Sequence, residues 1–250
     1  MRVHPPKEMD VSKSERYLAC YSGVLTLAFA AVVLTGASTA RSENFDQIDV
    51  QRINLREADG TLRMVISNRD RFPGLIFKGK EYKHPRANAG MIFYNDEGTE
   101  NGGLIFSGKR VDGKVVNAGG SLTFDQFEHD QVVQLLGVQE DGKEQAGMIV
   151  NDRPLRPIVQ DLEEMPELDA MAAGDREKLM QGRYESGYYG KQRLFIGKNA
   201  ERSSIVTLKD DKGRTRLRLQ VAADGAAKIE FLDADGKVQG SVTPESTVKQ

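Results

Sequence analysis

Short glycine turns recur along the chain after residue 41, and each lies between stretches in which apolar and polar residues alternate. Asp-Gly and Asp-x-Gly steps supply the positive φ angles that tight hairpins require. The turns end at Gly60, Gly98, Gly113, Gly142, Gly213, Gly225 and Gly236. This pattern predicts a mainly β fold, in which antiparallel hairpins and meanders form one irregular β structure.

The alternation also predicts which side chains share a face of a strand. In the last third, Leu217, Leu219 and Val221 alternate with Arg216, Arg218 and Gln220, so one face is apolar and the other is charged or polar. The stretch 51–68 predicts a hairpin by the same reasoning. We expect Ile53, Leu55, Leu62, Met64 and Ile66 to face a core there, and Arg52, Arg56 and Arg63 to face solvent.

Residues 154–186 interrupt the β pattern with an acidic, helix-favouring composition. Pro166 and Gly174 interrupt this segment, so it predicts short helices instead of one long helix. It would connect a larger β region, residues 41–153, to a smaller one, residues 187–250. Tyr184, Tyr188 and Tyr189 are expected to pack where this connector meets the next sheet.

The N-terminal part contains 24 consecutive residues without a charge, "YLACYSGVLTLAFAAVVLTGASTA", at positions 17–40. That length is sufficient to cross a bilayer, which needs about 20 apolar residues. The segment predicts an uncleaved transmembrane anchor that contacts the lipid bilayer. A cleaved signal peptide is the alternative, because Ser38 and Ala40 form a small-x-small pair that a signal peptidase accepts.

Basic residues set the expected orientation of this segment. Arg2, Lys7, Lys13 and Arg16 precede it, whereas Arg41 and Arg52 follow it over a similar length. Residues 1–16 are therefore predicted to form a cytoplasmic tail of a single-pass protein of the cell membrane. Residues 41–250 are predicted to be exported, and would be secreted or periplasmic if the segment is cleaved.

Composition excludes several classes of function. A formal net charge of -2 argues against binding to nucleic acid. The single cysteine, Cys20, lies in the apolar segment and is interpreted as a small hydrophobic residue. The exported part can therefore have neither an internal disulfide nor a thiolate nucleophile.

The stretch 89–108, "AGMIFYNDEGTENGGLIFSG", contains the only metal-site candidates, Asp96, Glu97 and Glu100, with amide oxygens from Asn95 and Asn101. Such oxygens suit Ca²⁺, but their spacing does not match a known calcium loop. We interpret the stretch as a turn at Gly98, with Asn95–Asn101 exposed. Met91 and Phe93 on one strand, and Leu104 and Phe106 on the next, would then face a core. No catalytic or cofactor-binding residue and no cofactor is predicted.

His129 lies between Glu128 and Asp130. Neighbouring residues in a strand point to opposite faces, so no local pair of histidine and carboxylate is expected, and His129 is predicted to be a surface or turn residue. An enzyme would require the loop Asp96–Glu100 to converge with His129 or Asp125.

Three strings resemble a family of bacterial exported or membrane-anchored proteins to which no activity is assigned. They are "IDVQRINLREADGTLRMVISNRDRFPG", "AGMIFYNDEGTENGGLIFSG" and "LTFDQFEHDQVVQLL", and they fall within about residues 45 to 155. The resemblance implies a location in the bacterial envelope and implies no chemistry.

Two functions remain open from the sequence. The first is a non-enzymatic, membrane-anchored envelope protein whose all-β module binds another envelope protein or its own copies. It predicts exposed edge strands or a large apolar patch. The alternative is a carboxylate- or metal-dependent hydrolase that uses the loop Asp96–Glu100.

Overall fold

The computed structural model describes residues 12–36 and 42–247, and the chain divides into two units after Asp49. In the first unit, helix α1 (Lys13–Gly36) is long and apolar enough to cross a membrane. A signal sequence has the same properties. The Ser38–Ala40 pair and residues 1–11 of the expected tail lie outside the described residues.

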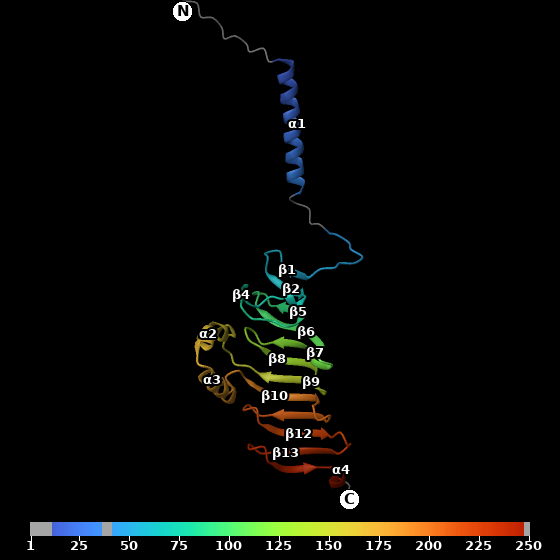
Figure 1. The fold of residues 1–250 in the computed structure, drawn as a ribbon, viewed down its shortest axis with the longest axis vertical. Coiled ribbons are helices and arrows are strands. Elements are labelled where there is room, and N and C mark those ends of the chain that lie inside the picture. The colour runs from blue at the N-terminus through green and yellow to red at the C-terminus, as the bar shows by residue number, and fades with distance from the viewer. Residues whose placement is uncertain (1–11, 37–41, 248–250) are drawn as a thin grey trace, which may run out of the picture. The chain divides into compact units, whose positions relative to one another are not determined.

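The second unit is built on one twelve-stranded sheet in which every neighbouring pair is antiparallel (Figure 1). The mainly β prediction is therefore confirmed, with β1 and β14 as the edge strands. In spatial order the strands are β1 (Arg52–Arg56), β2 (Leu62–Ser67), β5 (Ala89–Tyr94), β6 (Glu100–Val111), β7 (Lys114–Asp125), β8 (Gln131–Glu140), β9 (Lys143–Asp152), β10 (Lys191–Lys198), β11 (Ser204–Lys209), β12 (Thr215–Val221), β13 (Ala227–Leu232) and β14 (Val238–Val242), followed by the short helix α4 (Pro244–Thr247).

The helical connector forms two helices, α2 (Val159–Ala170) and α3 (Ala173–Ser186). Short helices were expected, but the break lies at Met171 and Ala172, since Pro166 is inside α2 and Gly174 is inside α3. The chain then returns to the sheet, where β10 pairs with β9. The β strands on either side of the connector thus continue a single sheet.

Both connector helices lie on the same face of the sheet (Figure 1). The guanidinium groups of Arg156 and Arg183 both lie over the Tyr188 ring, at 3.9 and 4.5 Å from its centroid. Those arginines also reach α2, through Arg156–Asp161 at 3.0 Å and Arg183–Glu164 at 2.7 Å. Tyr188 also packs edge to face against Tyr189 at 5.0 Å, whereas Tyr184, expected to pack with them, is 73% exposed.

A small insertion between β2 and β5 covers another part of that face. It contains the short 3₁₀ helix η1 (Arg69–Arg71) and a hairpin of β3 (Leu75–Phe77) and β4 (Lys80–Tyr82). Ile76 and Phe72 of the insertion join sheet residues in a compact core. The sheet residues in this core are Leu62, Val65, Ile92 and Tyr94.

The core therefore lies on the opposite face from the one expected for most of the 51–68 hairpin. Ile53 and Leu55 are 43% and 54% exposed, whereas Val65 is fully buried. Leu62 is buried as expected. The expectation was wrong because alternation identifies residues that share a face, and the insertion covers the face that carries Val65 and Arg63.

Apolar residues of the neighbouring strands β5 and β6 also face away from the core. Phe93 and Phe106, which were expected to face a core, are 39% and 56% exposed, and Met91 and Leu104 are only partly buried. The core instead takes Ile92 and Tyr94 of β5.

The 95–101 stretch is a turn, as interpreted from the sequence. Gly98 has φ +69°, and the Asn95 side-chain oxygen accepts hydrogen bonds from the backbone N–H groups of Glu97 and Thr99, both at 3.0 Å. The stretch is not fully exposed, because the β3–β4 hairpin packs on it. Gly79 N–H donates to the Gly98 carbonyl, and Thr99, which is 1% exposed, accepts from Lys78 N–H.

We predict that Gly98→Val lowers the free energy of unfolding by about 1–3 kcal/mol, because a β-branched residue is strained at positive φ. Gly98→Asn is the matched control, since Asn tolerates this conformation, and it is expected to cost less. Urea unfolding of the detergent-solubilised chain measures both values. Equal losses for Val and Asn would contradict the conformational explanation.

Candidate functional site

The three candidate carboxylates of the 95–101 turn each contact a different cation. Asp96 contacts Arg63 at 2.6 Å, Glu97 lies 3.9 Å from Lys78, and Glu100 pairs with Arg86. The turn therefore does not bring these carboxylates into one site. Within residues 12–36 and 42–247, no group of three or more His, Cys, Asp or Glu is placed to hold a metal ion.

Glu100 instead belongs to a charged cluster at one margin of the sheet, where β5 and β7 end and β6 and β8 begin. The side chains of Glu100 and Arg86 are only 15% and 16% exposed. Asp125, at the end of β7, and Asp130 lie near enough to interact electrostatically with Glu100. Arg153 contacts Asp130 at 3.5 Å. The cluster thus contains three acids and two arginines.

Asp125 has the most unusual proton affinity in this cluster. Burial, followed by the charges of Glu100 and Asp130, raises the pKa of Asp125 to about 7, although Arg153 and Arg86 act in the opposite direction. One of its carboxyl oxygens is buried without a hydrogen-bond partner among the described residues. Burial also raises the pKa of Glu100. Asp125 can therefore exchange a proton near neutral pH, beside a carboxyl group that Arg86 holds in place.

The alternative function required the loop acids to converge with Asp125 or His129. Glu100 approaches Asp125, whereas Asp96 and Glu97 are held elsewhere by Arg63 and Lys78. Of the groups that this function requires, the structure thus brings only Glu100 and Asp125 near each other.

His129 lies in the turn before β8, as expected, but it is buried with 5% exposure. Its Nδ1 accepts a hydrogen bond from the backbone N–H of Asp130 at 2.7 Å. Burial and the nearby Arg156 lower the pKa of His129, so the ring is neutral at pH 7. Burial and Arg86 likewise lower the pKa of His84. The structure places His129 as a neutral ring that supports a turn.

A second candidate is the face of the sheet opposite the helices. Each of the twelve strands contributes one aliphatic residue to a continuous row of directly paired neighbours, which we call the apolar ladder. It consists of Ile53, Ile66, Met91, Leu104, Leu122, Leu135, Met148, Ile196, Val206, Leu219, Ile229 and Val242. Paired residues point to the same face, so the ladder runs across the whole sheet.

A second row of directly paired residues runs beside the ladder, two residues away along each strand, and points to the same face. Its members are Leu55, Met64, Phe93, Gly102, Phe124, Val133, Val150, Leu194, Leu208, Leu217, Phe231 and Gly240. Neither row contains an ionisable side chain. The central part of this face is therefore uniformly apolar.

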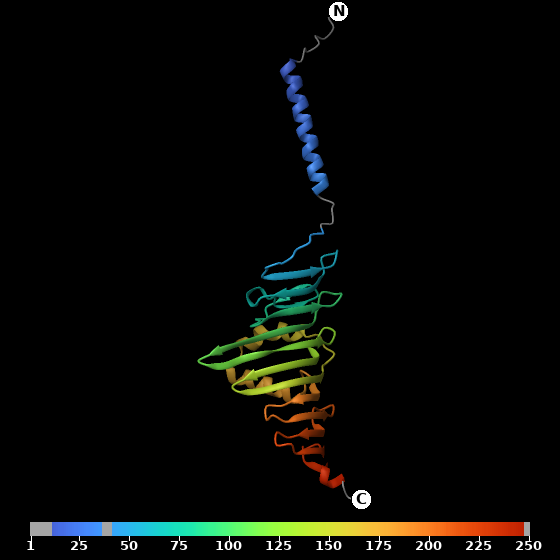
Figure 2. The ribbon, with the colours of Figure 1, turned by 90° about the vertical axis from the view of Figure 1, so that its right-hand side faces the viewer.

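None of the ladder side chains is buried, and Leu135 and Ile196 are 43% and 41% exposed. Figure 2 shows this face of the sheet with α2 and α3 behind the strands. No helix or strand of residues 50–247 lies over it. Single exposed apolar residues are normal in soluble proteins, but a contiguous apolar surface of this extent indicates an interaction site.

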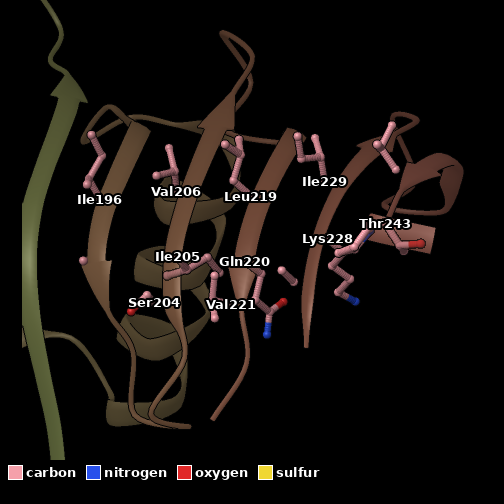
Figure 3. A pocket seen from close by; sticks show the side chains of 14 residues that line it. Ile196, Ser204, Ile205, Val206, Leu219, Gln220, Val221, Lys228, Ile229 and Thr243 are labelled. Atoms are coloured by element: carbon pink, nitrogen blue, oxygen red, sulfur yellow. The ribbon is translucent and has the colours of Figure 1, made fainter. Parts of the chain in front are cut away.

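A shallow hollow marks the C-terminal part of this face. It has a volume of about 670 Å³ over β10 to β14, and Pro244 of α4 lies beside it. Figure 3 shows Ile196, Val206, Leu219 and Ile229 side by side across four neighbouring strands, with a helix behind them.

Alternation in the last third of the chain predicts an apolar face, whereas the apolar residues of 51–106 were expected to face a core. The signal for the complete ladder was present, since each strand alternates. The sequence pattern does not specify the register that aligns the twelve strands, nor which face of the sheet the chain covers.

Asp125→Asn is predicted to alter the pH dependence of stability. The native pKa of Asp125, about 7, exceeds the ordinary value of 3.8, so ionising this group lowers the free energy of unfolding as pH rises from about 4 to 7. The neutral amide removes this loss. The variant should be more stable than wild type at pH 8, with a smaller difference at pH 4, in urea unfolding measured at both values. If the two proteins differ in their free energy of unfolding by the same amount at pH 4 and at pH 8, the pKa of Asp125 is not raised.

Comparison with protein-family models gives no match to this chain, and comparison with curated proteins gives none either.

Proposed function

We propose that this chain is a membrane-anchored, non-enzymatic protein of the bacterial envelope whose β module works through the apolar face of its sheet. The observation that carries the proposal is the apolar ladder, which extends over all twelve strands and is not buried in the described chain. Leaving such a face in water is unfavourable by about 25 cal/mol per Å² of apolar surface. A binding or assembly surface accounts for its retention.

The charged cluster supports this choice because one pair in it, Arg86 and Glu100, attaches the insertion to the sheet. Arg86 ties Glu100 to the segment after β4, and its guanidinium lies 5.6 Å from the ring centroid of Phe72 in the core. Lys78 similarly links the β3–β4 turn to Glu128 in the turn before β8, at 2.6 Å. These contacts join the insertion to the sheet, which is a structural role.

A carboxylate-dependent hydrolase is the second candidate, and the raised pKa of Asp125 beside Glu100 favours it. A general acid needs a pKa near the operating pH, which Asp125 has. It also needs a site open to substrate, whereas Glu100 is engaged with Arg86 and mostly buried. Hydrolysis of chromogenic ester or glycoside substrates that disappears in Asp125→Asn would establish this function.

The anchor is tested by extraction of the full-length chain from bacterial membranes. We expect the protein to require detergent and its N-terminal sequence to begin near Met1, because α1 would remain in the bilayer. A soluble form that begins near Arg41 would show that the segment is a cleaved signal peptide.

Cysteine labelling tests whether the apolar face is a binding surface. In a Cys20→Ser background, Leu135→Cys probes the ladder and Tyr184→Cys is the control on exposed α3. We expect a membrane-impermeant maleimide to label position 135 at least 10-fold more slowly than position 184 in native membranes. Dilution into detergent should largely remove the difference, since bound partners dissociate.

Equal labelling of the two positions in native membranes would mean that the face is bare in its natural setting. The proposed function would then be wrong. A difference that persists after dilution would reflect the local environment of position 135, and would count against a reversible partner.

A further inference from the structure

We infer that the occupant of the apolar face is a second copy of this chain, packed sheet against sheet. This inference rests on the proposed function and identifies the partner of the same surface. It follows from the dimensions, the exposed area and the charges of the face.

The dimensions require a long and flat apolar partner. Twelve strands spaced about 4.8 Å apart extend the ladder over roughly 50 Å. A compact ligand covers only part of that distance. An identical face supplies aliphatic residues over the same length and with the same spacing, and two sheets pack face to face at about 10 Å.

The exposed area is sufficient for a stable dimer. Twelve side chains on this face are each more than a third exposed, namely Ile53, Leu55, Phe93, Phe106, Phe124, Leu135, Ile196, Leu208, Leu219, Val221, Phe231 and Val242. Together they present on the order of 1,000 Å², taking roughly 150–250 Å² for each fully exposed aromatic residue and somewhat less for each aliphatic one. A specific interface of standard size buries about 800 Å² on each partner.

The charges permit contact between identical faces. The ladder and its neighbouring row carry no ionisable group, so bringing two copies together buries no like charges there. On the same face, beside these rows, Lys198 of β10 and Glu144 of β9 form an ion pair at 2.6 Å. Their charges compensate each other within one chain. A partner that binds through opposite charge would require this face to carry an excess of positive or negative charge, and the centre of the face carries neither.

The surface relief also suits packing against itself. Gly102 lies between Phe93 and Phe124 in the second row, so two exposed rings stand on either side of a residue without a side chain. Beside the ladder, Phe106 pairs with Gly120, which pairs in turn with Gly137. Large aromatic residues thus lie next to glycines on this face, and such differences in height allow two sheets to interdigitate.

The test uses the purified full-length chain in lipid nanodiscs loaded with more than one copy. Phe124 or Phe231 on the apolar face is replaced by the photoreactive residue benzoylphenylalanine, which has a similar shape. Tyr184 on α3 is replaced in the same way as the control. We expect irradiation to produce a covalent dimer from positions 124 and 231, at least 10-fold more than from position 184. Peptide mapping should place the second attachment point on the apolar face of the other copy.

Four other outcomes would overturn the inference. Lipid adducts at positions 124 and 231 would identify an acyl-chain surface, and a crosslink within one chain would identify an internal cover. Equal dimer yields from all three positions would indicate contact through the anchors alone. In each of these cases the proposed function is decided separately, by the maleimide labelling of positions 135 and 184 in native membranes. The absence of any adduct at positions 124 and 231 would also overturn the inference. If positions 135 and 184 were then labelled equally, the proposed function would be overturned as well.

A disrupting variant provides a second measurement. Leu135→Asp, introduced into the Phe231 probe protein, should reduce the covalent dimer at least 10-fold, because it places a charge at the centre of the apolar interface. Tyr184→Asp is the matched control and should leave the yield unchanged. Thermal unfolding of each variant verifies that the sheet is intact. An unchanged dimer yield in folded Leu135→Asp would contradict the inference.

Discussion

Antiparallel backbone pairing across a single sheet is the constraint on which the rest of this structure depends. A sheet has two faces, and a chain that forms one layer must cover each of them or leave it to solvent or to a partner. In this protein the chain itself covers much of one face, with a hairpin insertion and two helices. The other face keeps an apolar ladder that the described chain leaves uncovered.

The two covering elements are attached by different interactions. The β3–β4 insertion contributes Phe72 and Ile76 to an apolar core and is further linked to the sheet by the Arg86–Glu100 and Lys78–Glu128 ion pairs. Helices α2 and α3 are held to the segments that flank them by the stacking of Arg156 and Arg183 on Tyr188. The buried charged cluster around Asp125 is a consequence of this arrangement, because covering a polar margin of the sheet removes its acids from water.

The turn and strand assignments illustrate how far local patterns extend. Gly98 has the positive φ that its turn was expected to need, and the hairpin of β1 and β2 forms where alternation predicted it. The assignment of Ile53, Leu55, Met91 and Phe93 to a core failed. Their alternation is the same whether the apolar face is covered by the chain or by another molecule, so the pattern could not distinguish the two cases.

The sequence by itself determined the β class, most of the turns, the helical connector, the apolar N-terminal helix and which residues of a strand share a face. Each of these depends on glycine conformation or on periodicity, which act over a few neighbouring residues. Only the tertiary structure decided that twelve apolar residues align in one ladder, that Glu100 lies near enough to Asp125 to act on it electrostatically, and that Val65 is buried while Leu55 is exposed. Those outcomes depend on strand register and on the packing of distant segments, which local patterns do not encode.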